Sequence, residues 1–576
     1  MTLPHCTDHS PTRQESRRWD PARKQQFISD FFDPDNPFLS RRQFAQEHGI
    51  PATTFQDWIV QADSAEQDPD LAAFFRSQAG RLFLQRLLLA LHLIFNLLNA
   101  CGLRQLAFFL RLTGLDRFVA SSYGFLHSFS TTLQDLLARY DEEERPRLTQ
   151  AMAQRSDQPR QIVACCDENF HHGPPCLVAV EPLSGFILAE EFQPHRDAAT
   201  WKQTLQRATA ALPVQVLVLG SDRAGALVAC AQTLQARHLP DLFHDMREMA
   251  GPLLLPLQRH IDLHAKDLQQ LVEKEEPVFQ ARLEQCQSEQ RHSDLQREAG
   301  EALTTIRILQ VLVKQEQQSC EQRRDEALQA LRGISEDAHP FDGHTGEAVT
   351  AEQLQQRLEQ RQATLEQVVE QAQLGEKAQQ ALQQGRRLVG VLVATLAWFW
   401  LLVRQRVDSW DLSEQQETAL YAWLLPGLYW QQRAASGRDA QQQRQYRELA
   451  QRLLAQAWSA DSPLSQLPQE ERVGLQRACW ELLGLYQRSS SCVEGRNGRL
   501  SLQQHGHTRL SPKRLKALTT LHNYLSQRAD GTTAAERFFA EKPLPVFDWL
   551  LQRMPPLPRP AARRPKNGQE QLLSTG

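Results

Sequence analysis

A chain of 576 residues and 65.8 kDa is too long for one hydrophobic core and should divide into about three or four units. Its net charge of -4, from 64 basic and 68 acidic residues, excludes a uniformly basic nucleic-acid binder, so any such role must rest on local patches. The ten cysteines show no paired-ligand spacing, which argues against a disulfide framework or a zinc module and favours a reducing cytosol.

Neither the N-terminus nor the two apolar runs predict export or a membrane partner. The first twenty residues are polar and lack the apolar core of a signal peptide. Residues 82–98 are interrupted by polar side chains such as Arg86 and Asn96, and the run 388–403 is only about sixteen residues long. A bilayer span needs roughly 20 apolar residues. Both runs are therefore expected to be buried helices.

Residues 1–150 are expected to form an all-helical, DNA-binding region with one or two helix-turn-helix modules. In LSRRQFAQEHGIPATTFQDWI, Gly49 supplies the turn, while Ala45, Ile50 and Phe55 fall where the two helices need small or apolar residues. The second helix would begin near Ala52. Its outer face, which would meet a DNA major groove, carries Thr53, Thr54, Gln56 and Asp57. An ordinary helical hairpin remains the alternative, and a similar hairpin is expected around Gly114.

The pattern changes to short β-rich runs from Gln161. QIVACCD, PCLVAVE and GFILAEEF predict a three-stranded antiparallel meander. A helix over 197–212, the buried strand VQVLVLGSD, a helix over 223–237 and a fifth strand in DLFHD follow. The order β-β-β-α-β-α-β, over 161–248, is that of an RNase H-like fold with a mixed sheet.

The remainder of the chain reads as mostly helical, so the expected fold class is α+β with helices dominating. Residues 249–485 are glutamine-rich and predict a helical insertion with a long hairpin, in which 339–346 is a turn. Residues 486–545 would return to the core. The segment 546–576 is rich in proline and arginine and is expected to be a tail.

Two aspartates close neighbouring strands of the expected sheet. Asp167 closes the first strand and Asp222 the fourth, so the order of the fold would bring their carboxylates within a few ångströms. Unpaired carboxylates at that distance repel unless protons or cations lie between them. Mg2+ prefers oxygen ligands of this kind, and two Mg2+ or Mn2+ ions are expected. Either aspartate alone would more often be a strand-end cap.

Glu494 is the candidate for a third ligand. It stands alone in SSSCVEGRNGRL, and no further acid occurs before Asp530. The basic residues after it would hold a DNA backbone beside the metal site; they are Arg496, Arg499, Arg509, Lys513, Arg514, Lys516 and Arg528. An exposed amphipathic helix with a solvated charged face is the alternative.

Asp167, Asp222 and Glu494 together resemble the catalytic trio of the DDE-type transposases of bacterial insertion sequences. The resemblance covers 161–248 and 486–540 best. It implies an RNase H-like core and metal-dependent cutting of element ends in duplex DNA. It also implies strand transfer into target DNA, a homo-oligomer on DNA, and a bacterial, nucleoid-associated location in the cytoplasm. In some of these families a Tyr, an Arg and a Lys have fixed spacing from the glutamate; here Tyr486 and Arg488 stand at other offsets, and Ser501 stands where the Lys is expected.

Other polar residues near the trio have weaker interpretations. His244, after the expected fifth strand, could face the site as a supporting group, with Asp245 and Glu248 as substitutes. Glu168 should point to the opposite face of its strand from Asp167. His171 and His172 lack further ligands at zinc spacing. Two rival functions remain: an RNase H-like nuclease or resolvase without strand transfer, and a domesticated DNA-binding or coiled-coil scaffold.

Overall fold

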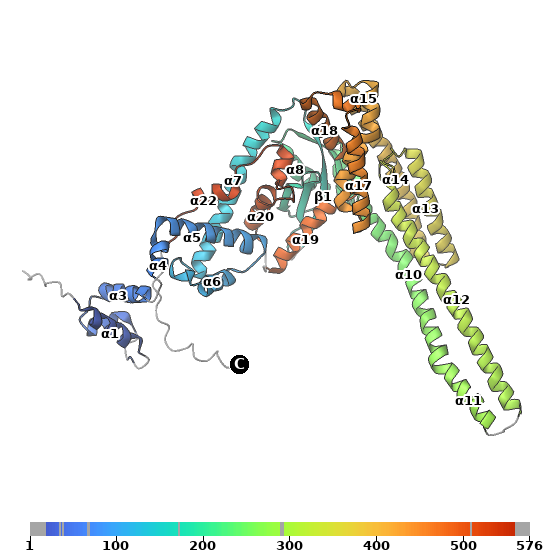
Figure 1. Ribbon diagram of the computed structural model, residues 1–576, viewed down its shortest axis with the longest axis horizontal. Coiled ribbons are helices and arrows are strands. Elements are labelled where there is room, and N and C mark those ends of the chain that lie inside the picture. The colour runs from blue at the N-terminus through green and yellow to red at the C-terminus, as the bar shows by residue number, and fades with distance from the viewer. Residues whose placement is uncertain are drawn as a thin grey trace, which may run out of the picture. The chain divides into compact units, whose positions relative to one another are not determined.

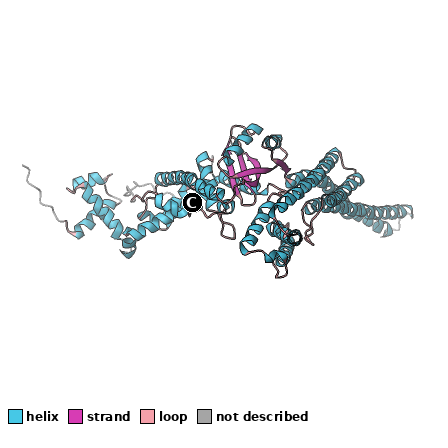
Figure 2. Ribbon diagram, turned by 90° about the horizontal axis from the view of Figure 1, so that it is seen from above, coloured by secondary structure: helices cyan, strands magenta, loops and turns pink. Residues whose placement is uncertain are grey.

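The structure is a computed structural model that describes residues 19–33, 36, 40–65, 69–170, 173–288, 293–506 and 510–558. Contacts divide the chain into two compact units, one of Met1–Leu136 with Phe547–Gly576 and one of Leu137–Val546. Helices dominate, and the described strands form one small five-stranded sheet (Figures 1 and 2). The predicted α+β class with mostly helical content is therefore confirmed. The described cysteines are all free.

The first unit is helical throughout its described residues. Its elements are α1 (Pro21–Phe32), α2 (Arg41–Glu47), α3 (Ala52–Ala65), α4 (Pro69–Arg76), α5 (Gln78–Leu91), η1 (His92–Leu98), α6 (Leu103–Leu112), η2 (Leu115–Arg117), the first part of α7 (Tyr123–Ala153) and most of α22 (Val546–Arg553). The segment predicted as a tail from 546 thus begins with a helix. Residues 559–576 lie outside the described part of the chain.

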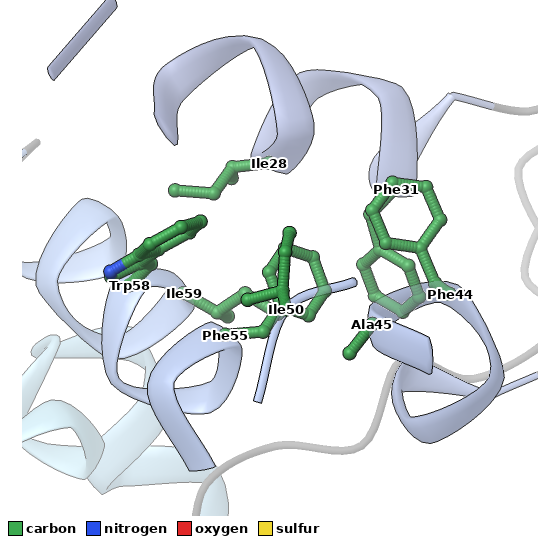
Figure 3. Packing of buried hydrophobic residues seen from close by; sticks show 8 residues of the cluster. All are labelled: Ile28, Phe31, Phe44, Ala45, Ile50, Phe55, Trp58 and Ile59. Atoms are coloured by element: carbon green, nitrogen blue, oxygen red, sulfur yellow. The ribbon is translucent and has the colours of Figure 1, made fainter. Parts of the chain in front are cut away.

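Helices α1, α2 and α3 share a small aromatic core (Figure 3). Phe31, Phe44 and Phe55 pack with ring centroids 5.1–5.5 Å apart, and Phe55 is fully buried. Ser40 caps α2 by accepting a hydrogen bond from the Gln43 N–H. Gly49, at φ 62°, makes the turn before α3, because a left-handed backbone suits glycine. The predicted turn and the start of α3 at Ala52 are confirmed.

Two helical stretches are long and apolar enough to cross a membrane by length and composition, Gln78–Leu98 and Glu376–Trp410. The fold buries 44% and 33% of their most apolar windows. In the second stretch the buried side chains recur at helical spacing, as at Leu388, Leu392 and Phe399, so one face packs on protein.

The sheet of the second unit has the strand order β3-β2-β1-β4-β5. Its strands are β1 (Arg160–Asn169), β2 (Cys176–Glu181), β3 (Phe186–Phe192), β4 (Val214–Ser221) and β5 (Arg237–Pro240). The pairs β1–β2 and β2–β3 are antiparallel, whereas β1–β4 and β4–β5 are parallel. Helices α8 (Ala198–Thr209) and α9 (Gly225–Thr233) connect the strands, and Asp197 caps α8 by accepting a hydrogen bond from the Thr200 N–H.

The position predicted for the fifth strand is wrong. DLFHD begins a helix, α10 (Leu242–Gln270), and the strand precedes it at Arg237–Pro240. The physical reason is the cap at Asp241, whose carboxylate accepts a hydrogen bond from the Phe243 N–H and starts α10 there. The preceding helix is accordingly shorter than predicted and ends at Thr233.

A helical insertion follows the sheet, as predicted. It contains, after α10, the elements η3 (Leu271–Glu275), α11 (Glu276–Ser288), α12 (Ser293–Asp337), α13 (Ala351–Gln371), α14 (Glu376–Val407), η4 (Asp408–Trp410), α15 (Glu414–Ala419), η5 (Leu420–Leu424), α16 (Leu425–Arg433), η6 (Ala434–Ser436), α17 (Ala440–Ala457), η7 (Pro463–Gln466) and α18 (Gln469–Leu483). Helices α10 and α11 run beside α12 as a long hairpin (Figure 1). The turn expected at 339–346 joins α12 to α13.

The chain returns to the sheet through α19 (Ser491–Gly506), α20 (Pro512–Tyr524) and α21 (Ala534–Phe539). Helix α19 contacts β1 and β2, and α20 packs on β3. The buried Asn523 of α20 accepts from the Ile187 N–H at 2.9 Å and donates to the Ile187 carbonyl at 3.1 Å. These bonds satisfy backbone groups of an edge strand that would otherwise be open to other chains.

Candidate metal-binding site

Asp167 and Asp222 extend from adjacent parallel strands. The register of β1 and β4 pairs Cys165 with Gly220, so two further residues on each chain bring Asp167 level with Asp222. Adjacent strands lie about 4.8 Å apart, and residues two apart share a face. Asp167 lies two residues before the end of β1, and Asp222 follows β4 directly.

The carboxyl of Asp167 is held in an environment that opposes its negative charge. Burial raises its pKa, and the nearby Asp222 raises it further. Hydrogen bonds from the Glu168 N–H at 2.8 Å and from the Asn497 amide at 2.7 Å lower it, as does the proximity of His244. The net effect of these influences is a raised pKa for Asp167. A cation beside the carboxylate would stabilise its charged form.

Helix α19, which carries Glu494, contacts Asp167. Asn497, which binds Asp167, lies one turn after Glu494, and residues three apart lie on one face of a helix. Glu494 Oε1 is 3.6 Å from His244 Nδ1, and His244 also acts on the pKa of Asp167. Helix α19 thus reaches the end of the β1–β4 pair, and Asp167, Asp222 and Glu494 are each half-buried. Among the described residues, the acidic and histidine side chains whose ligand atoms lie within 4.8 Å of one another are those of Asp241, His244 and Glu494, a group that does not include the two aspartates.

His244 and Asp241 connect α10 to α19. His244 Nδ1 lies 3.4 Å from Asp241 Oδ2, and the three side chains of Asp241, His244 and Glu494 could hold a metal ion. The oxygens of Asp241, however, are already occupied. Its carboxylate is buried and accepts hydrogen bonds from the Phe243 N–H and from the N–H and hydroxyl of Ser490. Asp241 therefore anchors the N-terminus of α19.

The site residues fit a hard divalent cation. Asp167 and Asp222 each accept one backbone hydrogen bond, from the Glu168 and Ala224 N–H groups, which fixes the carboxylates and leaves lone pairs for a ligand. His244 Nδ1 is buried and makes no hydrogen bond with the described residues, so it could support Glu494 or a bound ion. Carboxylate oxygens are the ligands that Mg2+ and Mn2+ prefer.

The expectation that Arg496 holds a DNA phosphate is wrong. Its guanidinium forms a two-pronged ion pair with the buried Glu190 of β3, both bonds being 2.6 Å, and the side chain is only 7% exposed. Thr519 of α20 donates to the same carboxylate. A guanidinium committed to a buried carboxylate cannot also reach a phosphate in solvent, so Arg496 instead fastens α19 to the sheet.

The other basic residues divide by exposure. Arg514 is buried, binds Gln503, and has a pKa that burial lowers to about 10, so the prediction that it contacts DNA is also wrong. Lys516 pairs with the buried Asp141 of α7 and is half-exposed. Arg499 is exposed and Lys513 half-exposed, so a role for both in DNA binding stays a prediction.

The helix α3 residues predicted to meet a major groove differ in accessibility. Thr53 is exposed, whereas Thr54 and Gln56 are partly buried and Gln56 accepts a hydrogen bond from Arg41. Their role in DNA binding stays a prediction. Arg509, His171 and His172 lie outside the described residues.

Glu168 and Asp245 have structural partners. Glu168 accepts hydrogen bonds from Arg196 and from the indole N–H of the buried Trp201 on α8, so it lies away from Asp167 as predicted. Asp245 pairs with Arg223 at 2.9 Å. The sequence suggested that Asn497 allows close approach of a phosphate or forms a surface turn, but not that it binds Asp167, and it gave no role to Asp241. The signal for the contact with Asp167 was the place of Asn497 one helical turn after Glu494.

Part of the chain matches a protein-family model. Residues 420–566, less than half of the chain, match the model of a family of unknown function, DUF6399. This stretch includes Glu494 and Asn497, whereas Asp167 and Asp222 lie outside it. No curated protein and no solved structure matches the chain.

Proposed function

We propose that this protein is a DDE-type DNA transposase, which cuts the ends of a bacterial insertion element and joins them to target DNA. The observation that carries the proposal is the meeting of three distant segments at Asp167. Asp222 shifts its pKa, Asn497 of α19 binds its carboxylate, and Glu494 lies one turn from Asn497. The neighbouring, parallel β1 and β4 agree with the RNase H-like core that the sequence predicts.

Asp167, Asp222 and Glu494 would hold two Mg2+ or Mn2+ ions. When bound, such ions would activate a water or 3'-hydroxyl and stabilise the leaving oxygen of a phosphodiester. The chain's own residues prepare the site: Asn497 orients Asp167, and the Arg496–Glu190 ion pair fixes the helix that carries Glu494. A preorganised site of this kind spends no binding energy on rearranging its ligands.

DNA recognition would involve the two helices α2 and α3 as a helix-turn-helix, with Thr53 at the groove, and exposed residues such as Arg499 at the backbone. The protein would work as a homo-oligomer on duplex DNA in the bacterial cytoplasm, associated with the nucleoid. The family resemblance supports these partners.

The test uses the full chain, Mn2+ or Mg2+, and a plasmid that carries the chromosomal DNA flanking the coding region. The wild-type protein should nick at the element ends and give joined products, whereas Asp167→Ala and Asp222→Ala should give neither. Glu168→Gln, which changes the adjacent acid on the other face, is the matched control and should stay active. Full activity of either aspartate variant would refute the proposal, and nicks without joined products would favour the nuclease or resolvase.

A further inference from the structure

A basic groove lies at the end of the sheet opposite to Asp167 and Asp222. Its first part is a cavity of about 360 Å³ at the beginnings of β1 and β4, lined by Arg160 of β1 and by Pro213, which directly precedes β4. Arg160 and Asp167 are seven residues apart on one strand, which corresponds to roughly 23 Å. The groove is therefore separate from the metal-binding site.

Arginine dominates the charge of this groove. Arg155, Arg160, Arg406 and Arg477 line the first cavity, and Glu481 is the one acid among its described lining residues. A second cavity of about 480 Å³ shares Arg160, Arg477 and Glu481 with the first, so the two adjoin at these side chains. The second cavity adds Arg528 and Arg537 and also two acids, Glu181 and Asp530, so six arginines face three acids over the two linings. In a chain with a net charge of -4, this local excess of positive charge would favour an anion.

Most of these arginines have partners within the fold, whereas Arg406 is open to a ligand. Arg160 donates to the Phe538 carbonyl and lies 4.6 Å from the centre of the Phe538 ring. Burial is the main cause that lowers the pKa of Arg537 to about 10, and the neighbouring Arg528 contributes. Arg406 is exposed and pairs with no carboxylate among the described residues.

The rest of the lining suits an organic anion. Trp410, Leu482 and Leu485 give the first cavity an apolar side beside its arginines. The planar fork of an arginine matches the oxygens of a phosphate in pairs. Arginines line both of the adjoining cavities. The groove therefore matches a series of phosphate groups better than a single small anion.

We propose that this groove is a second binding site, which takes phosphate groups of a nucleic-acid backbone or of a free nucleotide. The site needs none of the three acids at the other end of the sheet. It can therefore be tested in the Asp167→Asn chain without divalent metal, so that its failure and a failure of the transposase proposal are told apart.

The test is arginine-selective labelling with a dicarbonyl reagent, read by mass spectrometry, with a 20-base-pair duplex or ATP as the protecting probe. Arg406 and Arg477 should be protected. Arg444 is the matched control, because it pairs with Glu448 four residues on, as Arg477 pairs with Glu481, and lies on an exposed face of α17. Protection by the duplex alone identifies the backbone as the source of the phosphates, and protection by ATP identifies a free nucleotide.

Affinity measurements on variants complete the test. Arg406→Ala/Arg477→Ala should weaken binding of the protecting probe by roughly tenfold or more, as expected for two lost charge-assisted contacts, while Arg444→Ala stays near the parent value. The proposal is overturned if neither probe protects Arg406 and Arg477. Equal protection of Arg444, or unchanged affinity of the double variant, would overturn it as well.

Discussion

At the scale of single residues, the raised pKa of Asp167 links the site to stability. Burial and Asp222 raise the pKa in the folded state, so between the ordinary value and the raised value the folded protein holds a proton that the unfolded chain has lost. Stability therefore falls as pH rises through this window, and the loss is complete above the folded pKa.

Asp167→Asn should remove the loss of stability that comes from ionising this carboxyl in the folded protein. At pH 7.5 the variant is expected to melt about 1–3 °C above the wild type, and the difference should shrink as pH falls towards the ordinary pKa of an aspartate. Thermal unfolding followed by circular dichroism across pH measures the effect. Glu248→Gln, at an exposed acid of α10, should show no such pH dependence. An Asp167→Asn protein that is less stable at every pH would contradict this explanation.

The buried ion pair of Arg496 and Glu190 gives a second prediction at this scale. Arg496→Met leaves a buried carboxylate without its partner and should destabilise the protein by about 3–5 kcal/mol, measured by urea unfolding. Adding Glu190→Gln, which can still accept from Thr519, should recover most of the loss. Arg499→Met on the same helix should change stability by about 0.5 kcal/mol or less. If Arg496→Met instead lowers the salt dependence of DNA binding and leaves stability unchanged, Arg496 contacts a DNA phosphate after all.

For the helices and strands, the sequence was most informative where apolar residues recurred at a regular spacing or in an unbroken run. The alternating and continuous apolar runs predicted β1 to β4, and the turn at Gly49 predicted the start of α3. The fifth strand was misplaced because Arg237–Pro240 has only four residues, too few to show a period. Asp241, which caps α10 through the Phe243 N–H, also accepts hydrogen bonds from Ser490, far along the chain, and a local sequence pattern does not show that second contact.

The candidate site also had one part that the sequence could predict and one part that it could not. The nearness of Asp167 to Asp222 was predictable because each lies at or close to the end of its strand, and strand order determines which ends are neighbours. The burial of Arg496 and Arg514 was not, because it depends on Glu190 and on packing between α19 and α20. Positive charge in a sequence does not reveal whether a guanidinium faces solvent or a buried carboxylate.

The long hairpin of α10, α11 and α12 should be separable from the sheet at its outer end. Arg307 of α12 pairs with Glu276 of α11, and Arg324 binds Gln258 nearer the sheet, which fixes how the arms align. Replacing residues 266–316 with a short Gly-rich turn removes matched lengths of both arms. The shortened protein is expected to keep its β-sheet and its main thermal transition, measured by circular dichroism and limited proteolysis. Loss of the sheet in this variant would show that the outer hairpin is required for folding of the core.

In the whole molecule, contacts around α19 connect residues that are hundreds of positions apart in the sequence. Asn497 binds Asp167, Ser490 binds Asp241, and Arg496 binds Glu190, so α19 is attached to β1, α10 and β3 at once. A helical insertion lies between the first and last parts of this assembly without interrupting it. These attachments place the helix that carries Glu494 beside the strand that carries Asp167.

The most direct test of the central claim is calorimetric titration of the full chain with Mn2+. The wild-type protein should bind two ions, and Asp167→Asn, Asp222→Asn and Glu494→Gln should each lose or strongly weaken this binding, while Glu168→Gln should not. Unchanged Mn2+ binding in Glu494→Gln, with the protein still folded, would show that this glutamate and the aspartates do not form one site.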